Sequence, residues 1–79
     1  MRARVEFTVE PFVEGTPGSH VTAAVDAVAA TGLRAEIGPF GTTVEGDTAS
    51  VVTAVAALLD AAAVSGADRV SMQVTFTDD

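Results

Sequence analysis

Apolar and polar side chains alternate in two long stretches, one near each end of the chain. Every second residue is apolar from Arg2 to Glu10, and Arg69 to Thr77 follows the same period of two. Because successive side chains of a strand point to opposite faces, this period predicts two half-buried β-strands. Pro11 removes a backbone donor directly after the first stretch, so we expect the strand to end there.

Two shorter segments in the middle of the chain alternate in the same way. Leu33 to Ile37 predicts a second strand, and Thr42 to Gly46 predicts a short third strand. The residues between them, Gly38-Pro39-Phe40-Gly41, are typical of a turn because glycine and proline interrupt regular structure. These two strands are therefore expected to follow one another as a hairpin.

A spacing of three and four residues between apolar positions predicts two helices. We expect Ser19 to be the N-cap of the first, since its hydroxyl can accept from an amide two or three residues on, and Gly32 to end it. Asp47 or Thr48 is expected to cap the second helix, which should reach about Ser65. The apolar faces contain Val21, Ala24, Val25, Val28 and Ala29 in the first helix, and Val51, Val52, Val55, Leu58, Leu59 and Ala62 in the second.

The order of elements is β-α-β-β-α-β, which predicts an α+β sandwich of the ferredoxin-like type in one domain, residues 1–79. Right-handed crossovers give an antiparallel sheet with strands in the order 4-1-3-2 and both helices on one face. The strand residues expected to meet the helices are Val5, Phe7, Val9, Val44, Val70, Met72, Val74 and Phe76.

The other face of the predicted sheet has no helix to cover it. It carries Arg4, Glu6, Thr8, Thr43, Glu45, Arg69, Ser71, Gln73 and Thr75. Such a face is either solvated or packed against a second sheet, and in the second case its polar groups need partners. A chain of 79 residues buries only about 60–65% of its unfolded surface, so we expect it to self-associate into a dimer or a tetramer.

Charge and composition narrow the possible functions. The chain has eleven acidic residues against four arginines, a net charge of −7, and no cysteine. This balance disfavours nucleic acid as a partner, which needs a basic surface, and it excludes disulfides and thiolate metal sites. The longest apolar runs, Ala54–Leu59 and Ala61–Val64, are far shorter than the roughly 20 residues of a membrane span. We expect a cytoplasmic protein without a membrane partner, a metal or a cofactor.

Three features could carry chemistry. Pro39 to Gly46 brings together an aromatic side chain, two hydroxyls and a carboxylate, although an ordinary turn entering a strand would look the same. Glu6 and Glu45 are expected on neighbouring strands of the helix-free face, either around a cationic ligand or in an ion-pair ladder with arginines. The junction from Thr16 to Ser19 offers hydroxyls and free amides to a ligand, or simply caps a helix. His20 has no second histidine for a metal site, and its expected role is structural.

Four segments of the sequence resemble the family of small thiamine-binding proteins. They are residues 5–11 (VEFTVEP), 18–21 (GSHV), 41–46 (GTTVEG) and 66–70 (GADRV), and the resemblance extends from about residue 4 to residue 76. It implies a ferredoxin-like domain that binds thiamine (vitamin B1) or its hydroxymethylpyrimidine moiety in the cytoplasm without catalysis. It also implies a dimer or tetramer assembled through sheets. The ligand contacts that it implies are Glu6, Thr8, Ser19, Phe40, Gly41, Thr42, Thr43 and Glu45.

The chemistry of thiamine is compatible with these side chains. The ligand has a cationic thiazolium ring and an aminopyrimidine with hydrogen-bond donors and acceptors, so it needs an apolar slot, a carboxylate and polar partners. Phe40 or Phe12 could form the slot, and Glu45 or Glu6 could accept from the amino group or balance the cation. Two other functions remain open, an oligomeric regulatory domain for a different ligand and an enzyme that uses a carboxylate as acid or base.

Overall fold

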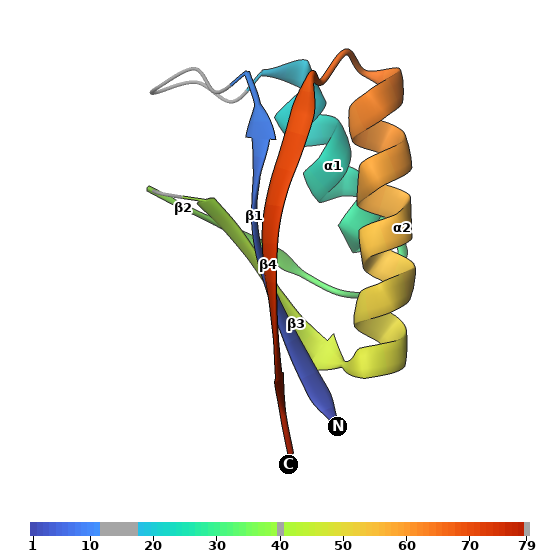
Figure 1. Cartoon of the computed structure of the whole chain (residues 1–79). Coiled ribbons are helices and arrows are strands. Elements are labelled where there is room, and N and C mark those ends of the chain that lie inside the picture. Colours follow the sequence, from blue (N-terminus) through green and yellow to red (C-terminus); the bar gives the residue numbers. More distant parts are fainter. Residues whose placement is uncertain (12–17, 40, 79) are drawn as a thin grey trace.

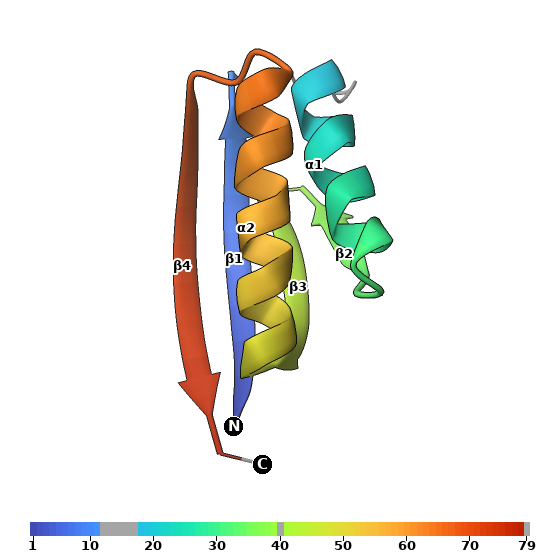
Figure 2. The same cartoon turned by 90° about the vertical axis from the view of Figure 1, so that its right-hand side faces the viewer.

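The computed structural model describes residues 1–11, 18–39 and 41–78, and these form one antiparallel sheet covered by two helices (Figure 1). The strand order is β2-β3-β1-β4, which confirms the predicted order, and both helices lie on the same face of the sheet (Figure 2). The elements are β1 (Arg2–Glu10), α1 (Ser19–Ala30), β2 (Ala35–Gly38), β3 (Gly41–Asp47), α2 (Thr48–Val64) and β4 (Arg69–Thr77).

The register of the sheet sets the apolar residues of the central strand β1 beside apolar residues of β3 and β4. Val5 pairs with Val44 of β3 and with Val74 of β4, so these side chains share the helix-covered face. Glu6 pairs with Thr43 and Gln73, and these point to the helix-free face. One face of the sheet is therefore apolar and the other polar, as the period of two predicts.

The core lies between the two helices and the centre of the sheet. Val5, Val28 and Leu58 are completely buried, and Phe7 is 2% exposed. Small residues fill the remaining contacts, since Ala24, Ala54 and Ala62 are also fully buried. In the described ranges 1–11, 18–39 and 41–78, no helix is long and apolar enough to cross a membrane.

The beginning of α1 differs from the expectation. Gly18, not Ser19, is the N-cap, and glycine has no side chain that could make a capping hydrogen bond. The Gly18 carbonyl instead accepts from the amides of Val21 and Thr22, which moves Ser19 into the first helical turn. Glycine is tolerated at this position almost as well as serine. The second helix is capped by Asp47, whose carboxylate accepts from the Ser50 amide at 3.1 Å and from the Ser50 hydroxyl at 2.7 Å.

The outer half of β4 also differs from the expectation. Val74 and Phe76 were expected under the helices, but they are 41% and 55% exposed. They have the predicted orientation, because they pair with the buried residues Val5 and Ala3 of β1. The expectation was wrong for these two residues because β4 is an edge strand, and α2 lies over the sheet centre and leaves the second half of β4 uncovered, whereas Val70 and Met72 still pack against the core (Figure 2).

Candidate functional site: an open cavity on the helix-free face

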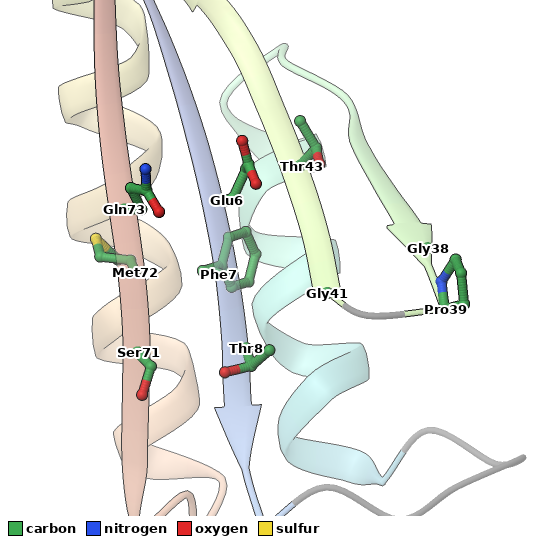
Figure 3. Close-up of a pocket in the computed structure, with 10 residues that line it drawn as sticks. All are labelled: Glu6, Phe7, Thr8, Gly38, Pro39, Gly41, Thr43, Ser71, Met72 and Gln73. Carbon is green, nitrogen blue, oxygen red and sulfur yellow. The ribbon is translucent and has the colours of Figure 1, made fainter.

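A cavity of about 480 Å³ lies on the helix-free side of the sheet and is open to solvent (Figure 3). Its volume is within the range of small-molecule sites, roughly 300–1,000 Å³. Three strands and the β2–β3 turn form it, so the site depends on segments that are far apart in the sequence. The lining residues are Glu6, Phe7, Thr8, Gly38, Pro39, Gly41, Thr43, Ser71, Met72 and Gln73.

Two rows of paired residues carry the polar side chains of the cavity. In the first row Glu6 of β1 lies between Thr43 of β3 and Gln73 of β4. In the second row Thr8 pairs with Ser71. Side chains directly opposite in an antiparallel pair have Cβ atoms about 4.5–5.5 Å apart, so each row presents its polar groups as one cluster. The first row combines one carboxylate, one hydroxyl and one amide.

The rim of the cavity depends on glycine at the start of β3. Gly41 pairs with Gly38 at the end of β2, and Pro39 lies beside them in the turn. A Cβ atom at Gly41 would lie 3.1 Å from the Phe7 carbonyl oxygen, closer than an ordinary contact. The absence of a side chain therefore lets β3 enter the sheet directly beside the cavity.

Among the residues that the structure describes, Glu6 is the one carboxylate that lines the cavity. The Arg4 Nε atom lies 3.4 Å from its Oε1 oxygen, and both side chains are about half exposed, at 53%. An exposed pair of this kind contributes little to stability. A carboxylate can accept hydrogen bonds at both oxygens, so Glu6 keeps the capacity to bind a donor in the cavity.

Glu45 lies on the same face but outside the cavity. It pairs with Arg4 across the strands, and the Arg4 Nη1 atom is 4.0 Å from its Oε1 oxygen. Arg4 thus stands between the two glutamates, as in the ion-pair ladder that the sequence left open. Of the two carboxylates, Glu6 is therefore the one placed along the cavity.

The remaining predicted site residues divide into three groups. Thr8, Gly41 and Thr43 line the cavity together with Glu6. Thr42 pairs with Phe7 on the helix-covered face and is only 5% exposed, so it does not line the cavity. Ser19 lies in the first turn of α1 and is not a lining residue either. Phe40 lies outside the described residues, as do Phe12 and the junction residues Thr16 and Pro17.

Sequence reasoning did not single out the β4 wall of the cavity. Ser71 and Gln73 line it, although only their place on the helix-free face was predicted. The pairing of β4 with β1 could have identified both residues, since it places Ser71 beside Thr8 and Gln73 beside Glu6. Gly38 and Pro39 were recognised as turn residues, but only the fold brings the turn to the cavity.

A cluster of side chains at the end of β1 and the start of β4 fixes one side of this wall. Arg69 donates to both carboxylate oxygens of Glu10, from Nε at 3.0 Å and from Nη2 at 2.7 Å. The Ser71 hydroxyl donates to Oε2 of the same carboxylate at 3.0 Å. The hydrogen bonds from Arg69, and secondly from Ser71, lower the pKa of Glu10 below its usual value. The cluster therefore holds Ser71 in place at the edge of the cavity.

His20 makes a structural contact. Its Nε2 atom is 2.5 Å from the Pro11 carbonyl oxygen, which can only accept, so Nε2 donates and joins α1 to the end of β1. Within the described part of the chain, no three histidine, cysteine, aspartate or glutamate side chains are grouped as metal ligands.

Fold and cavity together define a ferredoxin-like α+β protein with a polar site of small-molecule size on its open sheet face. The chain belongs to the thiamine-binding protein family, whose model matches residues 5–79. This match confirms the resemblance found in the sequence. No match was found among curated proteins.

Solved structures from several bacteria are similar to this chain. A protein of Thermotoga maritima, provisionally named a thiamine biosynthesis/salvage protein, is 25% identical, with a TM-score of 0.55. The match covers 95% of this chain and 81% of that one. A protein of Streptococcus pneumoniae is 26% identical, with a TM-score of 0.58 and coverage of 95% and 83%. A domain of unknown function from Bacillus cereus, 24% identical, has a TM-score of 0.59 and coverage of 96% and 76%, and it supports the fold alone.

Proposed function

We propose that this protein binds thiamine, or its hydroxymethylpyrimidine moiety, in the cavity on the helix-free face. The observation that carries the proposal is the row Gln73–Glu6–Thr43 along a cavity of about 480 Å³. Family membership makes a thiamine-related ligand the natural candidate for this cavity. We propose a cytoplasmic location, where bound ligand would be stored, sensed or delivered.

The polar groups of the row match those of an aminopyrimidine. Glu6 can accept a hydrogen bond from the amino group, whereas the Gln73 amide and the Thr43 hydroxyl can each donate to a ring nitrogen. The same carboxylate can balance the positive charge of the thiazolium ring if that ring lies above it. A ligand without these groups would leave polar atoms of the site unpaired, which costs about 1–3 kcal/mol for each buried group.

We further propose that binding is not followed by catalysis. Catalytic acids and bases commonly lie in sites that exclude water. Glu6 and Glu45 are about half exposed and adjacent to Arg4. This setting suits a carboxylate that holds a ligand by hydrogen bonds and charge.

The first prediction concerns the Glu6 carboxylate. Glu6→Gln should weaken thiamine binding at least about tenfold, because a hydrogen bond to a charged group contributes about 1.5–3 kcal/mol. Isothermal titration calorimetry with thiamine, and in parallel with hydroxymethylpyrimidine, measures the loss. A larger loss for thiamine than for the neutral pyrimidine would indicate that Glu6 faces the thiazolium ring.

Glu45→Gln is the matched control, since it makes the same change on the same face but outside the cavity. We expect it to alter the affinity less than about twofold, a change typical of an exposed charge. Equal losses in both variants, or an unchanged affinity in Glu6→Gln with intact circular dichroism, would contradict the placement of the ligand. An affinity of the wild type no better than millimolar for both compounds would contradict the function itself.

A further inference from the structure

The second polar row of the cavity is not used by the pyrimidine contacts proposed above. It consists of Thr8 on β1 and Ser71 on β4, which are directly paired and both line the cavity. Thr8 follows Glu6 by two residues, a distance of roughly 7 Å along an extended strand. The two rows are therefore far enough apart to contact different parts of one ligand.

The hydroxyl of Thr8 lies on the side of β4. A Cβ atom at Gly41 would be 3.5 Å from the Thr8 methyl carbon Cγ2, so the methyl group is the one that faces β3. Figure 3 shows the Thr8 oxygen on the opposite side of the same side chain, towards Ser71. A threonine hydroxyl can rotate to donate or to accept. Thr8 therefore brings an available donor to the space between β1 and β4.

Ser71 is fixed in the complementary role, that of an acceptor. Its hydroxyl donates to Oε2 of Glu10 at 3.0 Å, while Arg69 donates to both oxygens of the same carboxylate. These bonds, first those from Arg69 and then that from Ser71, lower the pKa of Glu10, so its carboxylate is ionised at neutral pH and can only accept. A hydroxyl has a single proton, and Glu10 engages that of Ser71. Ser71 can therefore offer only its lone pairs to a ligand.

A donor and an acceptor on adjacent strands match an alcohol. The oxygen of an alcohol can accept from Thr8 and at the same time donate its proton to Ser71. An alkyl group in the same place makes neither bond and leaves the polar atoms of the row without a partner. The second row is therefore suited to a ligand that carries a hydroxyl group at some distance from its aminopyrimidine.

Charges along β1 determine the direction in which thiamine extends from the first row. Arg4, Glu6 and Thr8 alternate along one face of the strand, so Arg4 and Thr8 lie on opposite sides of Glu6. The Arg4 guanidinium, 3.4 Å from Glu6, would repel the cationic thiazolium ring. Next to Thr8 lies Gly41, which has no side chain to occupy the space beside the second row. The second ring of thiamine is therefore favoured on the side of Thr8.

We infer that Thr8 and Ser71 bind the hydroxyl group of the hydroxyethyl arm of thiamine, with Thr8 donating to it and Ser71 accepting from it. Glu10 and Arg69 are positioning residues, because they act on the ligand only through the orientation of Ser71. This assignment rests on the proposed function and adds a specificity for the alcohol. The hydroxymethyl group of the free pyrimidine replaces the bridge between the rings of thiamine, so it stays near the first row.

The second prediction compares thiamine with an analogue that has an ethyl group in place of the hydroxyethyl arm. In calorimetry the wild type should bind thiamine about three- to tenfold more tightly than the analogue, as one hydrogen bond requires. Ser71→Ala should remove this preference by weakening thiamine alone, and its affinity for hydroxymethylpyrimidine should stay that of the wild type. Equal affinities of the wild type for thiamine and the analogue, or a preference that persists in Ser71→Ala, would overturn the inference.

Glu10→Gln tests the positioning role. The glutamine amide can donate to the Ser71 oxygen, which frees the Ser71 proton to turn towards the cavity, so the preference for thiamine over the analogue should fall. A purely structural role of Glu10 would weaken both ligands alike, and an unchanged ratio of the two affinities would remove Glu10 from the assignment. Glu45→Gln, the same change outside the cavity, is the control and should keep the ratio of the wild type.

The wild type alone separates failure of this assignment from failure of the proposed function. If thiamine and the analogue both bind no better than millimolar, the proposed function is contradicted and the assignment with it. If both bind tightly and equally, the cavity still holds the ligand but the second row does not select its alcohol. This comparison needs no variant, so it decides the matter even if a substitution at Ser71 disturbs β4.

Discussion

Thr42 and Thr43 follow one another in β3, yet their side chains lie on opposite faces of the sheet. Thr42 pairs with Phe7 and is 5% exposed, whereas Thr43 pairs with Glu6 and lines the cavity. Both are β-branched residues that favour a strand, so their type does not separate a packing role from a binding role. Their positions in the alternating pattern of the strand separate the two roles, because neighbouring residues point to opposite faces.

The two threonines therefore form a natural pair for a test at the residue scale. Thr43→Val keeps the shape of the side chain and removes its hydroxyl, and we expect thiamine affinity to fall about three- to tenfold, corresponding to the loss of one hydrogen bond. Thr42→Val should leave the affinity unchanged. Calorimetry on both variants gives the answer, and a loss of affinity in Thr42→Val alone would show that the ligand is held elsewhere.

At the scale of elements, the pairing of β1 with β4 is the longest in the sheet and supports one wall of the cavity. It runs from Arg2 opposite Thr77 to Glu10 opposite Arg69. The last pair is closed by the two hydrogen bonds from Arg69 to the Glu10 carboxylate. Charge-assisted contacts of this kind fix an orientation more than they stabilise an exposed surface.

This cluster should make stability depend on pH in a defined direction. Arg69 and Ser71 lower the pKa of Glu10 in the folded protein, so the ionised carboxylate favours folding. Its contribution is complete above the pKa of an unfolded glutamate, about 4.3, and is lost as the pH falls through the lower folded pKa. Glu10→Gln should therefore lower the Tm slightly at neutral pH and have no effect in strong acid.

Thermal unfolding followed by circular dichroism across this pH range measures the difference. Arg69→Gln removes the other partner and should show the same pH profile, and the double variant should add little to either single change. Additive effects, or a Tm difference that persists in strong acid, would assign the stability to some other contact of Glu10.

At the scale of the molecule, a small chain has a small core, and α2 contributes its centre. Leu58 is completely buried between the sheet and the helices, whereas Val64 at the end of the same helix is 82% exposed. A chain of this length is stabilised by roughly 4–12 kcal/mol in total. The loss of one central side chain is therefore a large fraction of that stability.

Leu58→Ala should reduce the free energy of unfolding by about 2–5 kcal/mol, the usual cost of a cavity at a leucine site. Val64→Ala should change it by less than about 0.5 kcal/mol, as is typical of the surface. Urea titrations at one fixed protein concentration measure both values. Similar values for the two variants would place the core elsewhere.

The sequence by itself determined the order of the elements and the two faces of the sheet. Strict alternation in Arg2 to Glu10 and in Arg69 to Thr77 reflects local geometry, because each residue of a strand reverses the side on which the chain presents its side chain. The start of α2 was also predictable from the sequence, because a cap is a local feature: Asp47 caps the helix that directly follows it. Ser19 was misplaced by one residue because glycine and serine are both accepted as caps.

Only the tertiary structure decided which polar residues meet. Glu6, Thr43 and Gln73 form one row because separate strands pair in a particular register, and no local signal in any one segment fixes that register. The tertiary structure also decided which strand residues the helices cover. Val74 lies on the same face of the sheet as Val5, but it is exposed because α2 lies over the centre of the sheet and not over its edge. Alternation assigns a side chain to a face, whereas packing determines what that face meets.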